Sequence, residues 1–356
     1  MIHKEHIAEK PLIIAMQDIE HDVLKNVNLN VKAGEIYSII GKSDSGKSEL
    51  LRCINRIHQP KYGKITIDNQ NLNCLLDKDI NNLRRKMALI TKIPQLIGSK
   101  NVFQNVALPL ELQNNISKND INKIVEPILH LVGIVDKFFN FPSQLNIMQK
   151  QLVSIARALV TKPKALLCDD ITYHLDVKST HQVVNLLNSI NKELGITILI
   201  VSNDIEVIKS LSHKVAVMDK GSITEESSAY EIFARPKTEF AKELVKAASR
   251  HEMPWVYRRK IRFQATQNQH PIVRISFTTA LATEHLLGQL IQDYQFKINI
   301  IQAYQEYVQH QPINVILAEI EGTSEENFEE IFNEAILFLN SHELHVEVLG
   351  YVANSI

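Results

Sequence analysis

Between an apolar run and a segment with helical periodicity, the chain reads Gly41-Lys42-Ser43-Asp44-Ser45-Gly46-Lys47-Ser48. This stretch fits the pattern G-x-x-x-x-G-K-[ST], in which a glycine-containing loop connects a buried strand to the start of a helix. In such a loop, backbone N–H groups and the helix dipole face a phosphate group. The sequence therefore predicts a phosphate loop, followed by a helix over residues 49–57.

Two side chains of this loop carry chemistry, and a second motif complements them. Lys47 is expected to reach the β- and γ-phosphates of a nucleotide, and the Ser48 hydroxyl to hold Mg²⁺. The second motif is the apolar run 165–168, which ends in Asp169 and Asp170. A carboxylate at the end of a buried strand suits Mg²⁺, so Asp169 is the candidate metal ligand and Asp170 the candidate base. Alone, such a pair also suits a helix cap, but its place after a phosphate loop favours the catalytic role.

Composition limits the number of domains and the kinds of partner that the chain is expected to have. The 356 residues suit two domains better than one, and a formal net charge of −1 gives no basic field for nucleic acid. Cys53, Cys74 and Cys168 share no metal-ligand spacing, which favours reduced, unpaired thiols. No apolar stretch is long enough to span a bilayer. Any membrane association is therefore expected to go through a partner protein.

Alternating apolar runs and helical segments extend to about residue 245. Four short, continuous apolar runs, typical of strands buried on both faces of a parallel sheet, lie at 36–40, 165–168, 196–201 and 215–218. Residues 146–159 form the clearest helical segment between them. We therefore predict an α/β fold, with a P-loop nucleotide-binding domain over 1–246. A linker is expected over 247–270.

The last part of the chain, 271–356, is predicted to be a separate small domain. Its strands are expected at 272–277, 297–301, 313–320 and 346–352, with helices at 283–294 and 324–339. Residues 323–326 provide a capping signal for the second helix. The order βαββαβ is that of a ferredoxin-like domain.

Several longer motifs carry a resemblance to a known family. Residues 141–145, 149–151 and 155–159, together with 163–169, resemble the signature helix and Walker B region of ABC-transporter ATPases. Residues 105–112, the terminal segment 346–352 and the small C-terminal domain look like the ATP-binding subunit of the methionine importer in particular. The resemblance covers nearly the whole chain, and it implies a helical subdomain near residues 92–160 of the nucleotide-binding domain.

The resemblance implies a function, cofactors and partners. It implies an ATP- and Mg²⁺-binding subunit that acts as a dimer, with two permease subunits and, indirectly, a substrate-binding lipoprotein. It places such a subunit peripherally, on the cytoplasmic face of the inner membrane. It also implies that the C-terminal domain binds methionine and inhibits transport, with Asn299 as the candidate ligand contact. A solvent-facing strand residue remains an equally good interpretation of Asn299.

The chain departs from the family's pattern around the nucleotide. Asp44 replaces a glycine and Glu49 a threonine, and both bring a carboxylate towards a polyphosphate. Lys92 aligns with the Q-loop glutamine, although a charged lysine cannot ligate a metal. No aromatic residue in 11–26 is available to stack on adenine, and His21 is the nearest substitute.

The catalytic motifs depart further. The signature motif is Leu145-Asn146-Ile147-Met148-Gln149, with side chains where the family has backbone-exposing glycines. By the resemblance, Gln149 would still contact nucleotide. Asp170 replaces the catalytic glutamate and is one methylene shorter. Asn203 replaces the switch histidine and carries no charge.

Two functions therefore remain open. The chain is either an energy-coupling ATPase of a methionine importer, or a catalytically impaired relative that acts as a binding or regulatory subunit. In the second case it docks on a permease or pairs with an active paralogue. A soluble ABC protein of the repair or translation type is disfavoured, because the sequence has neither a second nucleotide domain nor a long insertion.

Overall fold

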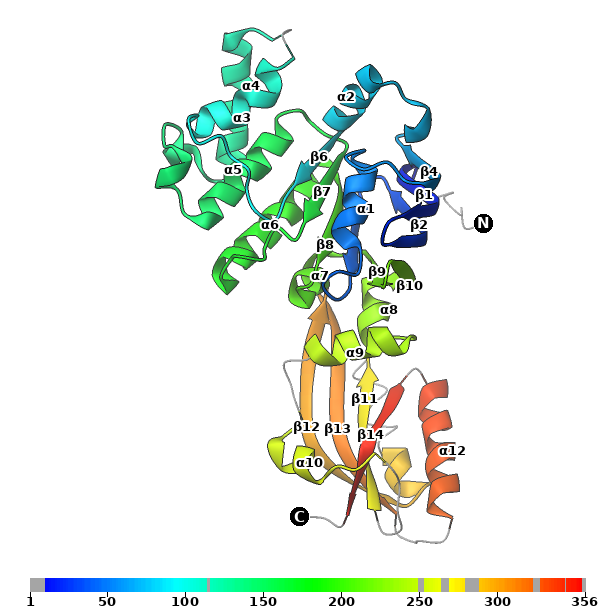
Figure 1. Ribbon diagram of the computed structural model, residues 1–356. Helices are drawn as coiled ribbons and strands as arrows, with labels where there is room; N and C mark the ends of the chain where they lie inside the picture. The colour runs from blue at the N-terminus through cyan, green and yellow to red at the C-terminus, as the bar shows by residue number, and fades with distance from the viewer. Residues whose placement is uncertain are drawn as a thin grey trace, which may run out of the picture. The chain divides into compact units, whose positions relative to one another are not determined.

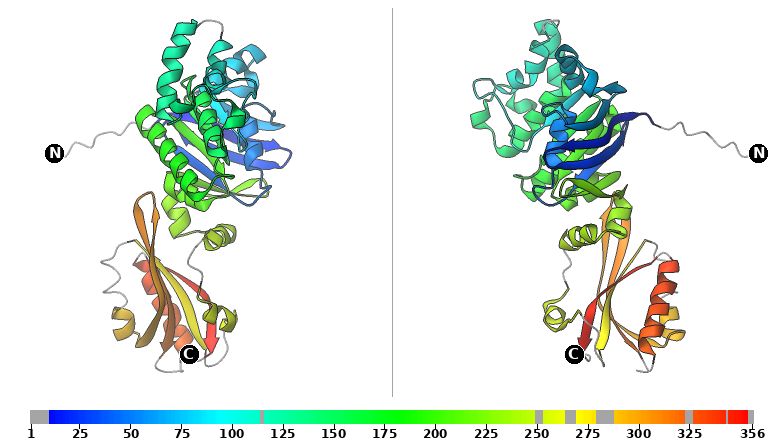
Figure 2. Two further views of the ribbon diagram at one scale, coloured as in Figure 1. Left: turned by 90° about the vertical axis from the view of Figure 1, so that its left-hand side faces the viewer. Right: turned by 45° about the vertical axis from the view of Figure 1, so that its right-hand side comes forward.

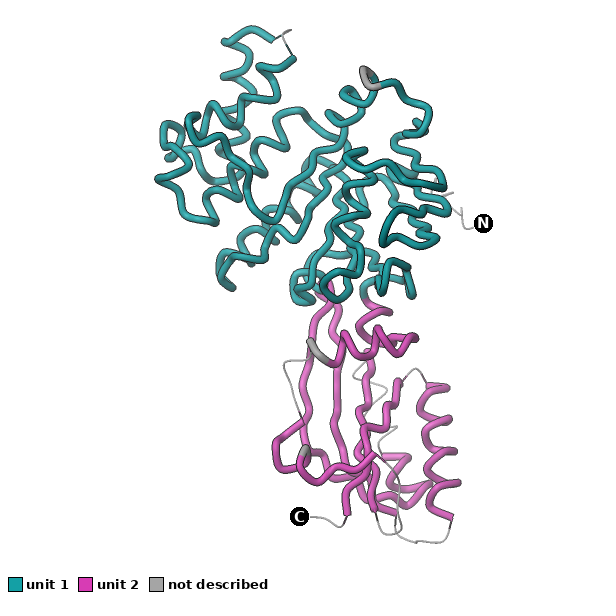
Figure 3. The backbone as a smooth tube through the Cα atoms, in the orientation of Figure 1, with its two compact units in different colours: residues 1–229 teal, residues 230–356 magenta. Residues whose placement is uncertain are grey.

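The computed structural model describes residues 10–113, 116–248, 253–263, 269–278, 288–322, 327–342 and 344–353. The chain divides into two compact units, residues 1–229 and 230–356, which Figure 3 shows in different colours. This division lies before the sequence-based boundary at residue 246. That boundary and the linker over 247–270, part of which lies outside the described residues, stay predictions.

The first unit is built on a six-stranded sheet in the order β10-β9-β3-β8-β7-β6. Its strands are β3 (Ile36–Ile40), β6 (Met87–Ile90), β7 (Ala165–Asp169), β8 (Thr197–Ser202), β9 (Lys214–Asp219) and β10 (Ser222–Ser228). All neighbours pair in parallel except β10, which is antiparallel to β9. The four strands predicted from apolar runs are confirmed as β3, β7, β8 and β9. Every residue of β3 and β8 is buried, which explains why their sequences do not alternate.

A second, antiparallel sheet completes the core beside the phosphate loop. It runs β2-β1-β4-β5 and consists of β1 (Leu12–His21), β2 (Leu24–Lys32), β4 (Tyr62–Ile67) and β5 (Gln70–Asn71). Helix α1 (Lys47–Ile54) contributes Leu50, Leu51 and Ile54 to a core cluster that contains residues of both sheets. Burial of this helix fixes the phosphate loop that precedes it.

The remaining helices of the first unit include a helical group in the region predicted as the helical subdomain (Figure 1). The group consists of α3 (Val102–Glu111), α4 (Lys118–Leu131) and α5 (Ile147–Leu159), with the short 3₁₀ turns η2 (Val135–Lys137) and η3 (Pro142–Gln144). The others are η1 (Leu72–Cys74), α2 (Asp77–Lys86), α6 (Val177–Leu194) and α7 (Ile205–Leu211). Helix α8 (Ala229–Ala234) begins at the last residue of this unit and otherwise belongs to the second. Within the described part of the chain, none of the helices combines the length and apolar character needed to cross a bilayer.

The second unit contains a four-stranded antiparallel sheet in the order β12-β13-β11-β14. Its elements are α9 (Glu239–Ala248), α10 (Trp255–Lys260), β11 (Gln269–Phe277), β12 (Phe296–Val308), β13 (Gln311–Gly322), α12 (Phe328–Ser341) and β14 (His345–Ala353). Helix α12 covers one face of the sheet, as the views in Figure 2 show, and its Phe332, Ala335 and Leu339 pack on β11 and β13. The strand order matches the predicted ferredoxin-like arrangement.

Two sequence-based details fall partly on residues that the structure does not describe. Of the helix predicted over 283–294, residues 283–287 lie outside the described residues, and residues 288–292 are helical. The capping signal at 323–326 also lies outside them, and α12 is described from Phe328.

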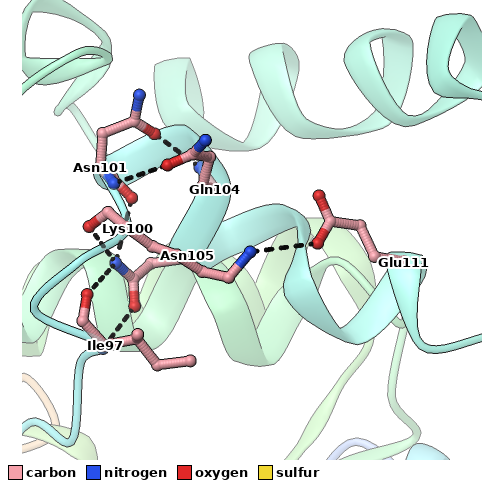
Figure 4. Close-up of polar contacts among 6 residues, drawn as sticks. All are labelled: Ile97, Lys100, Asn101, Gln104, Asn105 and Glu111. Carbon is pink, nitrogen blue, oxygen red and sulfur yellow. Dashed lines mark hydrogen bonds and ion pairs between the residues drawn. The ribbon is translucent and has the colours of Figure 1, made fainter.

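Asn105, at the start of the helical group, has a buried carboxamide that ties a loop to α3 (Figure 4). Its Oδ1 accepts a hydrogen bond from the Ile97 N–H at 2.8 Å. Its Nδ2 donates to the carbonyls of Ile97 (3.1 Å), Lys100 (2.7 Å) and Asn101 (3.0 Å). One buried side chain therefore makes four hydrogen bonds to the backbone of the loop and of the first turn. Asn101 and Gln104 add a capping box at the first turn.

We expect Asn105→Ala to lower the free energy of unfolding by about 2–3 kcal/mol, because it removes the four hydrogen bonds of one buried carboxamide. Urea denaturation followed by circular dichroism measures the change. The matched control is Gln104→Ala, whose exposed side chain contributes only its part of the cap and should cost less than about 1 kcal/mol. Equal losses in the two variants would contradict this role for Asn105.

Candidate functional site

The phosphate loop closes around the ammonium group of Lys47. The Nζ atom donates to the Gly41 carbonyl at 2.8 Å, to the Lys42 carbonyl at 2.7 Å and to the Ser45 hydroxyl at 3.2 Å. Burial lowers the pKa of Lys47, while the carboxylates of Asp170, Asp169 and Asp44 act in the opposite direction. The loop thus holds a desolvated positive charge at the N-terminus of α1, where an anionic group is favoured.

The two glycines of the motif are required by the backbone path. A Cβ at Gly41 would lie 2.1 Å from the Met218 carbonyl oxygen of β9, which is far inside van der Waals contact. Gly46 has a φ of +101°, and a Cβ there would meet Leu24 and Met218 at 3.1 Å. Side chains at either position would therefore displace the loop from the sheet.

Asp44 occupies the outer turn of the loop and is exposed. Its φ is 62°, in the left-handed region that glycine enters without steric cost and that aspartate enters more readily than most residues. This backbone angle explains physically why the family resemblance places a glycine here. The substitution keeps the turn and adds a carboxylate.

The second motif meets the loop at the carboxyl end of β7. The Ser48 hydroxyl donates to Oδ1 of Asp169 at 2.7 Å. Burial raises the pKa of Asp169, and the hydrogen bond from Ser48 partly counteracts this. A hydroxyl and a carboxylate at one point are ligands that Mg²⁺ accepts. The structure thus brings together the predicted residues Lys47, Ser48 and Asp169, and these residues fit a magnesium–phosphate group.

The next carboxylate, Asp170, is engaged by a lysine. Its Oδ2 lies 3.4 Å from Nζ of Lys92, and the same ammonium lies 3.0 Å from the centre of the Tyr173 ring. Its Oδ1 accepts a hydrogen bond from Ser202 at 3.2 Å. An ammonium does not fit the role of a metal ligand. Lys92 therefore places a cation against the candidate base.

Sequence analysis identified Lys92 and Asp170 separately but missed their ion pair. Lys92 follows β6 and Asp170 follows β7, and these strands are parallel neighbours. The carboxyl ends of adjacent parallel strands meet at one edge of a sheet, so the strand order was the signal that could have revealed the contact.

The signature segment forms the start of α5. Asn146 is its N-cap and accepts a hydrogen bond from the Gln149 N–H at 2.8 Å, while Oε1 of Gln149 accepts one from the Asn146 N–H at 3.0 Å. Gln149 is therefore part of a capping box. Ile147 lies in the first turn and is 40% exposed. Asn203 is exposed in the loop after β8, the parallel neighbour of β3.

Glu49, the other added carboxylate, has its charge balanced locally. Its Oε1 lies 3.1 Å from Nε2 of His21 and 2.5 Å from Nδ1 of His58, and its Oε2 lies 3.5 Å from Arg52. The sequence did not suggest that Glu49 contacts His21, or that His58 contacts the same carboxylate.

In the second unit, the candidate ligand residue Asn299 is exposed on β12 and lies opposite Glu319 of β13. Its Nδ2 lies 3.4 Å from Oε2 of Glu319, a long contact. Glu319 is only 4% exposed, and among the described residues its Oε1 has no hydrogen-bond partner. Sequence analysis missed Glu319, although a glutamate inside the apolar run 313–320 was a visible signal.

Comparisons with known proteins agree with this geometry. Residues 24–173 match the family model described as ABC transporter, and residues 271–348 match the NIL domain. A structure of cbiO1 from Clostridium perfringens, part of an ABC transporter complex, is 30% identical with a TM-score of 0.60, over 64% of this chain and 92% of that chain. The ATP-binding cassette MJ0796 bound to ADP and Pi is 32% identical with a TM-score of 0.57, over 61% and 98%. The fold and the site therefore define an ABC-transporter nucleotide-binding protein with an added NIL domain.

Full-length relatives specify the family further. The Methionine import ATP-binding protein MetN of Coxiella burnetii is 37% identical over 93% of this chain and 92% of its own length. MetN proteins of Aliivibrio fischeri and of Vibrio vulnificus strain YJ016 are 37% and 38% identical, each over 94% of this chain and 95% of their own length. The chain belongs to the family of methionine import ATP-binding proteins.

Proposed function

We propose that the chain is the ATP-binding subunit of an ABC importer for methionine, and that its own turnover is slow. The observation that carries the proposal is the set of contacts around Lys47, Ser48 and Asp169 in a chain that also has a NIL domain. These residues provide the side chains that nucleotide binding requires. The names of the full-length relatives support methionine as the transported substrate.

Nucleotide binding follows from the charges in the loop. The Lys47 ammonium is already desolvated and ringed by carbonyl oxygens, so a phosphate oxygen gains a strong charge-assisted hydrogen bond there. Ser48 and Asp169 would hold Mg²⁺, which neutralises developing negative charge on the phosphates when it is bound. Residues 41–49 with Lys92 and Gln149 are the proposed nucleotide contacts.

Slow turnover follows from three departures that act on one reaction. Lys92 lies 3.4 Å from Oδ2 of Asp170, and its ammonium group occupies an oxygen that would otherwise accept a proton from the attacking water. Gln149 is used in the capping box of α5, and Ile147 and Met148 add bulk where a partner's nucleotide would approach. Asn203 carries no charge. Phosphoryl transfer depends on positioning and electrostatics, and its parts act as a unit.

The cellular setting follows from the family. We propose that two copies pair, dock on two permease subunits and act indirectly with a substrate-binding lipoprotein, peripherally on the cytoplasmic face of the inner membrane. The NIL domain is proposed to bind methionine and to inhibit transport, with Asn299 as a contact. The buried, incompletely partnered carboxylate of Glu319 beside it suits a ligand ammonium group.

A second candidate function is a binding or regulatory subunit that lacks turnover and pairs with an active paralogue. The observation that favours it is the Lys92–Asp170 contact, which the ATPase function does not require. Measured turnover separates the two functions.

The first test concerns turnover. We expect the purified chain to release phosphate from ATP-Mg²⁺ at least about a hundredfold more slowly than a restored variant. The restored variant combines Lys92→Gln, Asp170→Glu and Asn203→His with Asn146→Ser, Ile147→Gly and Met148→Gly. Asp170→Glu alone is the control and should change little, because the other defects persist. Comparable steady-state rates for the unmodified and restored chains would refute slow turnover.

The second test concerns Asp44. Asp44→Asn removes the charge and keeps a residue that tolerates φ near 62°, whereas Asp44→Gly removes both the charge and the steric cost. If the carboxylate repels phosphate, both variants should tighten ATP binding by about three- to tenfold. Equilibrium binding of a fluorescent ATP analogue in low salt measures this. Tighter binding in the glycine variant alone would assign the effect to the backbone.

The third test concerns methionine. Calorimetry with the full chain should show methionine binding, and Asn299→Ala should weaken it about five- to tenfold through loss of a hydrogen bond. Gln305→Ala, an exposed amide on the same strand, is the matched control and should bind as the parent does. Absence of heat from a folded parent chain would rule out the proposed site.

A further inference from the structure

A cluster of two histidines and a glutamate lies at the start of α1, beside the phosphate loop. The atoms Nε2 of His21, Oε1 of Glu49 and Nδ1 of His58 all lie within 4.8 Å of one another. The shorter separations are 3.1 Å between His21 and Glu49 and 2.5 Å between His58 and Glu49. The nitrogen atoms of both rings converge on the same carboxylate oxygen.

We propose that His21, Glu49 and His58 form a binding site for a divalent transition-metal ion of the Zn²⁺ class. Two imidazoles and one carboxylate are a ligand set that Zn²⁺ accepts, with a further position left for water or another ligand. Hard cations such as Mg²⁺ and Ca²⁺ prefer oxygen ligands, so the nitrogen-rich set favours a transition metal. The proposal is independent of nucleotide binding.

The distances from the two histidines to Glu49 need only small adjustments. Bonds of about 2.0–2.1 Å in a tetrahedral site place ligand atoms roughly 3.3–3.4 Å apart. The His21–Glu49 separation of 3.1 Å is already close to this value. The His58–Glu49 separation must lengthen, and His58, with a side chain 40% exposed, has room to rotate. Ion binding would thus separate atoms that now form a short hydrogen bond.

The backbone holds the two histidines near each other. His21 ends β1, and His58 follows α1 on the segment that leads into β4. The Lys61 N–H donates to the Glu20 carbonyl at 2.8 Å, and Glu20 lies opposite Tyr62 in the β1–β4 pair. Glu49 lies in the first turn of α1, whose apolar face is buried. Three fixed elements therefore supply the ligands.

Neighbouring charges orient the carboxylates. Arg52 lies 3.5 Å from Oε2 of Glu49, which leaves Oε1 directed at the histidines. Asp22, on the rim, has Oδ1 held by Lys61 at 3.0 Å and Oδ2 at 3.5 Å from Nε2 of His21. Asp22 thus lies at the edge of the cluster, beside His21. Such outer contacts commonly position the ligands of a metal ion.

One feature limits the affinity. The Nδ1 atom of His21 is buried and has no hydrogen-bond partner among the described residues. A ring that binds metal through Nε2 carries its proton on Nδ1, and that proton would lack the acceptor that usually fixes the ring. We therefore expect a dissociation constant on the order of 1 µM rather than a tight structural site.

The experiment uses the full chain, stripped of metal by a chelator and free of nucleotide. Zn²⁺ is titrated in competition with a chromophoric chelator, and native mass spectrometry gives the stoichiometry. We expect one Zn²⁺ per chain at this site, undisturbed by millimolar Mg²⁺. His58→Gln and Glu49→Gln should each weaken binding about 10- to 100-fold. Circular dichroism without metal verifies that each variant is folded.

The matched control is His174→Gln. His174 is exposed and lies outside the cluster, with its ring against Tyr173, so this variant should bind Zn²⁺ as the parent does. Failure of the parent chain to bind Zn²⁺ at 100-fold the expected constant would overturn the proposal. Unchanged binding in both His58→Gln and Glu49→Gln would overturn it equally. Because no nucleotide is present, neither result depends on the proposed transport function.

Discussion

The structure of the first unit depends on keeping one ammonium group out of water. Lys47 is buried, and burial of a charge is unfavourable unless polar groups replace the lost hydration. The carbonyls of Gly41 and Lys42 and the hydroxyl of Ser45 do so, which forces the loop to close tightly on the side chain. Tight closure against β9 leaves no room for a Cβ at Gly41. The position of Ser48, and with it the contact to Asp169, follows from that closure.

Much of the fold was predictable because it rests on patterns that are local in sequence. The buried strands β3, β7, β8 and β9 are continuous apolar runs, and α5 begins where Asn146 and Gln149 form a cap. The element order of the C-terminal domain predicted a ferredoxin-like arrangement, and the sheet has the strand order of that fold. The phosphate loop was identified from its spacing, and the structure places Lys47, Ser48 and Asp169 together.

The contacts that sequence analysis missed are those between segments far apart in the chain. The pairing of Lys92 with Asp170 depends on strand adjacency, and the convergence of His21 and His58 on Glu49 depends on the β1–β4 pair. The contact of Glu319 with Asn299 likewise depends on the register of β12 against β13. Periodicity says which face a residue occupies, but it does not say which residue stands opposite. Contacts between charged residues that lie far apart in the chain can be identified only once the fold is known.

The capping box at Asn146 and Gln149 has an evolutionary consequence. Because the helix start is capped by these two side chains and by backbone groups, the cap does not use the side chains of the two residues between them. Ile147 and Met148 can therefore drift without loss of structure, and selection for protein abundance would not remove the changes. A chain of this kind can lose an ancestral activity gradually and remain a well-folded assembly partner, so that gene duplication would preserve it for a new role.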